Sequence, residues 1–269
     1  MAEGEVIGIF GGSGLYQLLE GAREVKVETP FGPPSDSIWL GEMGGRQVAF
    51  MPRHGRDHTI PPHRINFRAN LYAMRQAQVG RVLAPCAVGS LRAELAPGHV
   101  VIPDQFVDRT WGRADTFWDG PRVQHVSAAD PYCPELGAQA AAAAARQGAT
   151  VHQAETLVVI QGPRFSSRAE SRWFSAQGWG VIGMTGYPES ILARELGICY
   201  AAISLVTDYD AGLEGSAEIA PVTHEEVLKV FAANIGRVRQ ILFDLVEQLP
   251  AKAGCHCAAT QPLPQLASS

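Results

Sequence analysis

The sequence has little positive charge, few cysteines and no long apolar run. Its 22 lysine and arginine residues face 27 aspartate and glutamate residues, a formal net charge of −5, so it has no broad basic field for nucleic acid. No uninterrupted apolar stretch approaches the roughly 20 residues of a membrane-spanning helix. The segment Met1–Glu5 lacks the basic start of a signal peptide. We therefore expect a cytoplasmic protein with neither nucleic-acid nor membrane partners.

Cysteine is scarce, with five residues in the whole chain. Cys86, Cys133 and Cys199 stand singly in apolar surroundings, where a thiol usually packs as a small hydrophobe. The run Cys255-His256-Cys257 suggests a metal ligand pair or a local disulfide. A tetrahedral zinc site needs four ligands, however, and the sequence shows no second Cys/His pair to supply the others. We therefore predict no metal site.

What the chain does have is enough apolar residues for a full core, 46% of 269. No Pro/Gly/Ser-rich linker, charge block or repeat divides it. Short β-rich runs alternate with longer helix-like stretches, which is typical of an α/β domain built on one sheet. We expect a single α/β domain over residues 1–249, followed by a loose, small and polar tail over residues 250–269.

The final helix has the clearest start signal among the predicted elements. Thr223 is a plausible N-cap, and Glu226 follows at the capping-box spacing. Apolar residues then recur at the helical period. Strands are predicted at Val6–Phe10, Val48–Met51, Arg81–Ala84, His99–Ile102, Leu157–Ile160 and Ile198–Val206, and helices at Arg64–Gln78, Leu136–Gln147, Ser167–Gln177, Pro188–Leu196 and Thr223–Leu249.

Small or basic residues follow three of the predicted strands. The loop Gly11–Gly14, which contains Ser13, follows the first strand, and its backbone N–H groups could approach an anion closely. The stretch Arg53–His58 follows the second, and arginine is well suited to gripping phosphate while histidine can add a donor. The small residues Pro85–Ser90 follow the third. Because open α/β sheets bind ligands beyond the carboxyl ends of their strands, we predict one anion site there.

The glycine loop by itself leaves a dinucleotide-binding site open, because Glu28 lies about 20 residues past Gly8. Two observations weigh against it. The glycines are not in the G-x-G-x-x-G register, and the stretch Leu15–Arg23 is too short and broken for the helix of a nucleotide-binding βαβ unit.

A second group of candidates suits a base and a sugar. Phe165 stands beside a turn and could present its ring to a flat heterocycle, while Met184 offers an apolar surface for a sugar. Glu189 could accept hydrogen bonds from sugar hydroxyls. Asp208 and Asp210 end an apolar strand and lie on the same side of it. Carboxylates in that position can perform acid/base chemistry or bind amino groups.

In this order, the segments resemble the phosphorolytic, trimeric branch of the purine nucleoside phosphorylase family over roughly Val6–Leu249. GGSGL, RHGRDHTIPP, NFRANLYA, DQFVDRT, GPRFSSRAES, MTGYPE and TDYD carry the resemblance, which is specific because they occur together. It implies a twisted mixed central sheet flanked by helices. It also implies a homotrimer, or a dimer of trimers, with sites near the subunit interfaces. No cofactor is expected, and inorganic phosphate is a co-substrate.

The resemblance assigns a role to each matching position. Ser13, Arg53, His54, Cys86, Ala87 and Thr185 would hold phosphate; Phe165, Ser166 and Met184 would line the base and sugar; Asp208 and Asp210 would be catalytic and face N7 and the 6-amino group; and His58, His125 from a neighbouring subunit, His224, Val227 and Leu228 would surround the 5′ group.

Two positions indicate the base. Family members that act on 6-oxopurines typically have Glu and Asn where this chain has Ser166 and Asp208, and a carboxylate suits the amino group of adenine. Val227 and Leu228 replace a histidine that binds the 5′-hydroxyl, which favours an apolar 5′ group. We expect phosphorolysis of adenosine carrying a 5′-methylthio group. A broader or 6-oxopurine preference, hydrolysis by water, and nucleoside binding without catalysis stay open.

Three positions depart from the family pattern. Cys86 stands where threonine or asparagine is common, Gly183 where relatives have asparagine, and His224 where they have an apolar residue near the 5′ pocket. We expect the first change to weaken phosphate binding slightly and the last to loosen the preference for methylthio substrates.

Overall fold

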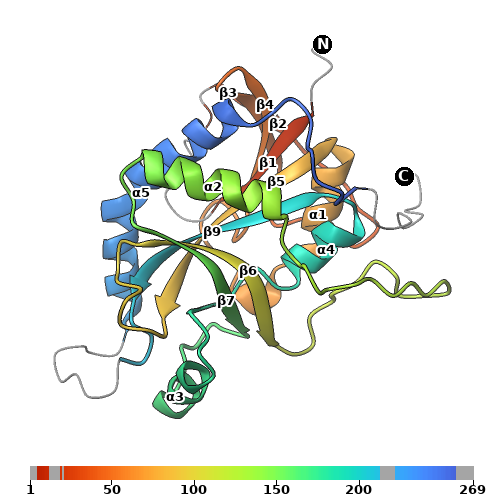
Figure 1. Cartoon of the computed structure of the whole chain (residues 1–269). Coiled ribbons are helices and arrows are strands. Elements are labelled where there is room, and N and C mark those ends of the chain that lie inside the picture. The colour runs from red at the N-terminus through yellow and green to blue at the C-terminus, as the bar shows by residue number, and fades with distance from the viewer. Residues whose placement is uncertain (1–4, 12–18, 20, 213–221, 259–269) are drawn as a thin grey trace.

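A nine-stranded mixed sheet runs through the computed structural model, with helices packed on both sides (Figure 1). The structure describes residues 5–11, 19, 21–212 and 222–258. The strand order is β2-β3-β4-β1-β5-β8-β7-β6-β9. The strands are β1 (Val6–Gly11), β2 (Arg23–Val25), β3 (Ile38–Met43), β4 (Arg46–Pro52), β5 (Val79–Ser90), β6 (Val100–Arg109), β7 (Val151–Ile160), β8 (Val181–Gly183) and β9 (Cys199–Asp208).

Five α-helices and one short 3₁₀ turn lie within the described residues. Two helices begin with the capping box: the side chain of Thr223 accepts from the Glu226 N–H, as predicted, and that of Ser167 accepts from the Glu170 N–H. The helices are α1 (Phe67–Gln76), α2 (Pro134–Arg146), α3 (Arg168–Ala176), α4 (Glu189–Glu195) and α5 (His224–Gln248), and the turn is η1 (Pro62–Arg64).

The parallel strands end at one edge of the sheet. Strand β1 pairs in parallel with β4 and β5, and β5 pairs in parallel with β9. Strand β9 also pairs with β6, so that β5, β8, β7, β6 and β9 close into a ring. The register sets Gly89 beside Asp208. The segments that follow β4, β5 and β9 are therefore brought together.

Two helices cover each face of the sheet. Helices α2 and α5 pack on β9 and on each other, while α1 and α4 pack together on the other face (Figure 1). In α5 the buried residues Val238, Ile241, Leu242 and Leu245 recur at the helical period and form the stripe that meets the sheet. Burial of these two apolar layers fixes the sheet from both sides.

Every helix and strand predicted from the sequence is present, but β5, β6 and β7 each extend six or seven residues beyond one end of the predicted strand. The prediction that Pro85–Ser90 follow a strand is therefore wrong, because these residues form the second half of β5. The sequence missed β2, β3 and β8. Strands β2 and β8 have only three residues each, and β3 contains both glycine and glutamate, so none gives a clear apolar alternation.

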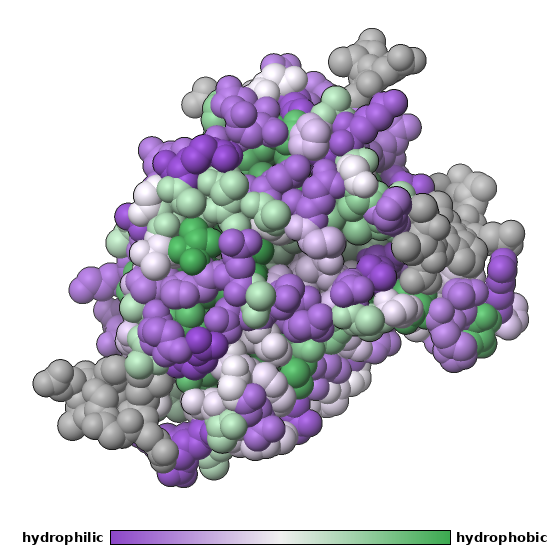
Figure 2. Space-filling view, viewed as in Figure 1, coloured by the Kyte–Doolittle hydropathy of each residue, from purple (hydrophilic) through white to green (hydrophobic). Residues whose placement is uncertain are grey.

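The surface is mostly polar, and the C-terminal segment is partly packed. Polar residues cover most of the face in Figure 2, and apolar residues lie there in small groups. Among the described residues, no helix combines the length and apolar character needed to cross a bilayer. The predicted loose tail lies outside the description from residue 259 onward, whereas Cys255 and Cys257 pack against the core.

Candidate active site

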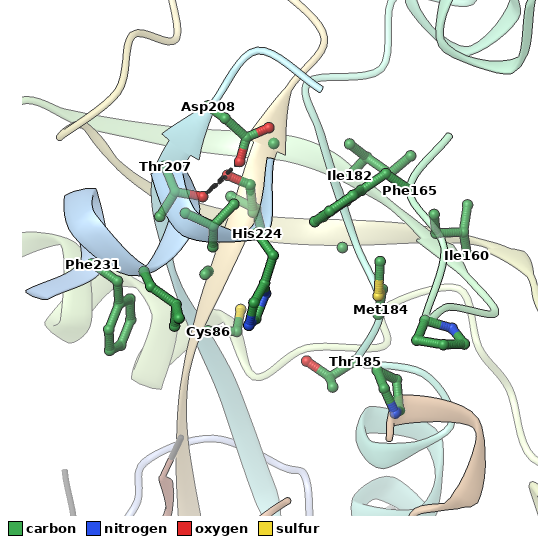
Figure 3. A pocket seen from close by; sticks show the side chains of 18 of the residues that line it. Cys86, Ile160, Phe165, Ile182, Met184, Thr185, Thr207, Asp208, His224 and Phe231 are labelled. Carbon is green, nitrogen blue, oxygen red and sulfur yellow. Dashed lines mark hydrogen bonds between the residues drawn. The ribbon is translucent and has the colours of Figure 1, made fainter. Parts of the chain in front are cut away.

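A cavity of about 260 Å³ lies at the sheet edge where β4, β5 and β9 end (Figure 3). Its size is near the lower end of the range for small-molecule sites. Most predicted site residues, although far apart in the sequence, line this one space: Arg53, His54, His58, Cys86, Ala87, Phe165, Met184, Thr185, Asp208, Asp210, His224, Val227 and Leu228.

Of the predicted site residues that the structure describes, Ser166 and His125 do not line the cavity. Ser13 lies outside the described residues. Ser166 follows Phe165, and its hydroxyl is buried. His125 is exposed in the irregular stretch between β6 and α2 and is not among the residues that line the cavity.

Asp208 is held by two hydrogen bonds at the end of β9. The Thr207 hydroxyl donates to Oδ2 at 2.7 Å, and the Asp210 N–H donates to Oδ1 at 2.8 Å. Burial raises the pKa of Asp208 to about 6, with a further upward contribution from the Asp210 charge. Asp208 can therefore hold a proton much closer to neutral pH than an exposed carboxyl can.

Asp210 offers an acceptor beside this acid. Asp210 is 3% exposed, and its backbone adopts a left-handed conformation with a φ of 46°. Within the described part of the chain, Oδ2 accepts no hydrogen bond of good geometry, although the Ser171 and Ser166 hydroxyls lie close to this carboxylate. Burial raises the pKa of Asp210 by more than the nearby Ser171 and Ser166 hydroxyls lower it. A buried oxygen without a hydrogen bond of good geometry is ready to accept from a ligand N–H group.

Gly89 makes room for Asp208. A Cβ atom at position 89 would lie 2.9 Å from Asp208 Oδ1 and 3.2 Å from the Asp210 nitrogen. Any other residue would push the acid out of place. The sequence pointed to small residues here, but not to this contact.

Arg53 and Glu189 form a buried ion pair beside the cavity. Nε and Nη2 of Arg53 donate to Glu189 at 2.7 and 2.9 Å, and Nη1 donates to the Pro85 carbonyl at 3.3 Å. The Tyr200 hydroxyl also donates to Glu189. Because Glu189 has 0% exposure, the expectation that it accepts from sugar hydroxyls is wrong. It orients Arg53 instead, and Arg53 keeps the remaining N–H groups for an anion.

His54 presents an acceptor rather than the expected donor. Burial and the neighbouring Arg53 charge lower the pKa of His54 to about 4, so the ring is neutral near pH 7. Its Nδ1 lies 2.9 Å from the Ile60 carbonyl oxygen, which can only accept, so Nδ1 carries the proton. His58 stacks on this ring at 4.5 Å. Nε2 of His54 is therefore left with a lone pair.

Phe165 and Met184 approach from the side opposite the acids. Figure 3 shows Phe165 beside Ile182, with Thr207 and Asp208 across the central space. Arg113 holds this wall in place, because its guanidinium donates to the carbonyl oxygens of Met184 at 3.1 Å and Tyr187 at 2.6 Å. The sequence did not single out Arg113, since its partners are backbone atoms on distant loops.

The start of α5 closes the remaining side. His224, Val227 and Leu228 line the cavity together with Phe231. Phe231 was missed by the sequence analysis, yet it follows Val227 by four residues and therefore shares its helix face. The wall is mainly apolar, with one imidazole.

Comparison with known proteins places this geometry in a family. Residues 6–247 match the phosphorylase superfamily. The chain belongs to this superfamily. Its fold and the convergence of the predicted segments agree with that membership, which leaves the dinucleotide alternative without support.

Two relatives of known name show how the superfamily varies around this sequence. A purine nucleoside phosphorylase of Streptomyces coelicolor is 56% identical over 263 residues, covering 94% of this chain and 93% of the relative. An S-methyl-5′-thioadenosine phosphorylase of Nitrosopumilus maritimus is 50% identical over 254 residues, covering 94% of this chain and 95% of the relative.

Solved structures of superfamily members agree with the fold. A methylthioadenosine phosphorylase from an Antarctic soil metagenomic library superimposes with a TM-score of 0.83 at 41% identity, covering 90% of this chain and 85% of that one. A methylthioadenosine phosphorylase from Schistosoma mansoni in complex with adenine has a TM-score of 0.82 at 36% identity, covering 90% and 91%.

Proposed function

We propose that this phosphorylase cleaves 5′-methylthioadenosine with inorganic phosphate, yielding adenine and 5-methylthioribose 1-phosphate. One observation carries the proposal: a single cavity has a proton-holding acid pair on one side and an oriented arginine on another. An apolar helix wall completes it. This combination suits a purine, an anion and an apolar substituent at once.

The reaction needs opposite charges to be stabilised at its two ends. Cleavage of an N-glycosidic bond builds positive charge on the sugar and negative charge on the departing purine. Phosphate below the anomeric carbon stabilises the first charge and then attacks that carbon. Asp208, with its pKa raised to about 6, donates to N7 as the base leaves.

The base is held by the second acid. The buried Oδ2 of Asp210, which accepts no hydrogen bond of good geometry within the described residues, accepts from the 6-amino group of adenine. A 6-oxopurine has an acceptor at that position, so it would leave Asp210 without a donor. Phe165 and Met184 cover the base and the ribose from the opposite wall.

Phosphate is bound by both hydrogen-bond donors and a hydrogen-bond acceptor. Arg53 and the Thr185 hydroxyl donate, and the backbone around Ala87 approaches the anion at the end of β5. The lone pair on Nε2 of His54 accepts from the P–OH group of hydrogen phosphate. Such an acceptor selects an anion that still carries a proton.

The 5′ substituent lies against α5. Val227, Leu228 and Phe231 provide an apolar surface that suits a methylthio group better than a hydroxyl. His224 and His58 stand at its rim, so a hydroxyl can still be accommodated at lower efficiency.

A second candidate function is a purine nucleoside phosphorylase that prefers 6-oxopurines. The similarity to the Streptomyces coelicolor enzyme of that name favours it. The two functions differ in what the acid pair must do, because a 6-oxopurine requires a donor where Asp210 supplies an acceptor.

We further propose that the enzyme is a cytoplasmic homotrimer and needs no cofactor besides the co-substrate phosphate. Two large apolar residues of the stretch between β6 and α2 that also carries His125, Trp111 and Val123, are 66% and 67% exposed, which suits a covered interface. In such an assembly His125 would reach the 5′ pocket of a neighbouring subunit. Light scattering coupled to gel filtration measures the oligomeric state directly.

One assay tests the substrate proposal. Methylthioadenosine, adenosine, inosine and methylthioinosine are compared with and without phosphate. We expect methylthioadenosine to have the highest kcat/KM and base release to require phosphate. Faster turnover of either 6-oxopurine would support the second candidate, and adenine release without phosphate would show a hydrolase.

A further inference from the structure

Four cysteines from three distant parts of the chain meet at one point. Cys133 is the N-cap residue of α2, Cys199 begins β9, and Cys255 and Cys257 follow α5. Their Sγ atoms all lie within 4.8 Å of one another. From the sequence, Cys133 and Cys199 were expected to stand singly, with no second pair for Cys255 and Cys257. That expectation was wrong, because the fold supplies the pair.

We propose that these four thiolates bind one Zn²⁺ ion as a structural site. Zinc–sulfur bonds of about 2.3 Å in a tetrahedron set sulfur atoms about 3.8 Å apart, which this group can reach with small side-chain movements. Four thiolates complete the coordination sphere and leave no position for substrate. The site therefore differs in kind from the cavity, where the fifth cysteine, Cys86, lies.

The surroundings are already organised for ligation. The Leu136 N–H donates to Cys133 Sγ at 3.4 Å, and the Cys133 N–H donates to the Tyr200 carbonyl oxygen at 2.9 Å. The first fixes one sulfur at the positive end of a helix, which favours the thiolate. The second ties the start of α2 to β9 directly beside Cys199.

The segment carrying the other two ligands is also held. Arg46 on β4 donates to the carbonyl oxygens of Leu249 and Pro250, immediately after α5. A Cβ atom at Gly254 would lie 3.2 Å from Oε2 of Glu135, so the chain runs close to the first turn of α2. Figure 1 shows this dark blue stretch returning from α5 across the molecule.

The proposed ion would join the C-terminal segment to α2 and β9. Strand β9 carries Asp208 at its other end, but the ion itself has no open position for chemistry. We therefore expect zinc to contribute to stability rather than to turnover.

Disulfide formation is the chemistry that competes with zinc binding, and Cys199 and Cys255 are close enough for either. Their sulfur atoms are 3.2 Å apart, a distance between the roughly 2.05 Å of a disulfide and the roughly 3.8 Å of a tetrahedral zinc site. Oxidation of the same four thiols to two disulfides would release four protons and four electrons to an oxidant and leave no zinc ligand. The two outcomes therefore exclude each other in one molecule.

The test uses the full-length protein purified anaerobically from zinc-supplemented cells. We expect about one zinc per chain by elemental analysis. Replacement of zinc with Co²⁺ should produce the intense thiolate-to-cobalt charge-transfer absorption and the visible bands of a tetrahedral site. Zinc removal with a chelator should lower Tm by on the order of 5 °C or more, and added Zn²⁺ should restore it.

Two variants separate the cluster from the remaining thiol. Cys255→Ser should lose most of the bound metal and the tetrahedral cobalt spectrum, whereas Cys86→Ser should keep both. Metal-free protein in zinc-supplemented buffer, equal metal in the two variants, or an intact mass lower by two or four hydrogens would each overturn the proposal. If Cys255→Ser does not fold, the cobalt spectrum of the wild type still decides the ligand set.

Discussion

Arg53 and Glu189 lie 136 residues apart in the sequence and form a two-bond ion pair with side-chain exposures of 2% and 0%. The pair joins the end of β4 to the first residue of α4. It also explains how a buried arginine can face an anion site: the carboxylate fixes the plane of the guanidinium and offsets the cost of burying its charge.

Breaking this pair should weaken phosphate binding specifically. In Glu189→Gln the buried guanidinium loses its counter-charge and its second strong acceptor. We expect the KM for phosphate to rise about tenfold or more and the free energy of unfolding to fall by roughly 3 kcal/mol. Initial rates at varied phosphate and urea denaturation measure the two effects.

Glu195→Gln is the matched control for that change. Glu195 is also a buried carboxylate of α4, but it accepts from the Thr116 hydroxyl and the Phe117 N–H instead of an arginine. The control should leave the KM for phosphate unchanged. A similar rise in both variants would mean that burial of a carboxylate on α4, rather than the Arg53 contact, is responsible.

Gly89→Ala should lower kcat. The added Cβ atom would lie 2.9 Å from Asp208 Oδ1, and displacement of a catalytic group by about 1 Å can cost on the order of 10²-fold in rate. Gly137→Ala serves as the control, because its Cβ atom would make only a 3.5 Å contact with Ile102. Full activity of Gly89→Ala would argue that Asp208 need not occupy its observed position.

Asp208→Asn should abolish most turnover while preserving the local structure. Thr207 Oγ1 lies 3.2 Å from the Val88 carbonyl oxygen, so its hydroxyl can donate there and accept from the new amide. We expect kcat/KM for methylthioadenosine to fall about 10²-fold or more. Circular dichroism tests retention of the fold, and near-normal turnover would reject Asp208 as the acid.

The pH dependence of the wild type should report the same acid. Asp208 donates only when protonated, so kcat/KM for the nucleoside should decline as the pH rises through the Asp208 pKa of about 6. Profiles from pH 5 to 8 at saturating phosphate measure this limb. If the residual kcat/KM of Asp208→Asn declined over the same pH range, the titrating group would be a residue other than Asp208.

His54 should make folding sensitive to acid. Its pKa falls from 6.5 to about 4 in the folded protein, so the folded state binds fewer protons than the unfolded state between these values. Its contribution is fully present above about pH 6.5 and is lost as the pH falls toward 4, by on the order of 2 kcal/mol.

His54→Asn tests this linkage and keeps a donor near the Ile60 carbonyl oxygen. The unfolding free energy of the variant should depend less steeply on pH between 4 and 6.5 than that of the wild type. Denaturant titrations across this range measure the slope. Identical slopes would show that His54 titrates alike in the folded and unfolded chains.

Much of the fold followed from local patterns. The capping box at Thr223 and the apolar residues that recur after it predicted α5, and short β-rich runs predicted the positions of β5, β6 and β7 but less than half of their lengths. The short strand β8 was missed because three residues are too few to show an apolar alternation. Its place in the sheet depends on pairing with β5 and β7, which are distant in the sequence.

The sequence by itself determined which chemical groups stand at strand ends, because the chain order of a parallel sheet brings those ends to one edge. It therefore identified Arg53, Phe165 and Asp208 as parts of one site. Only the tertiary structure decided how the groups behave. Burial set the pKa of Asp208 and His54, helix packing gave Arg53 its carboxylate, and the path after α5 gathered four cysteines. These properties depend on distance and solvent exclusion between remote segments, which no local pattern specifies.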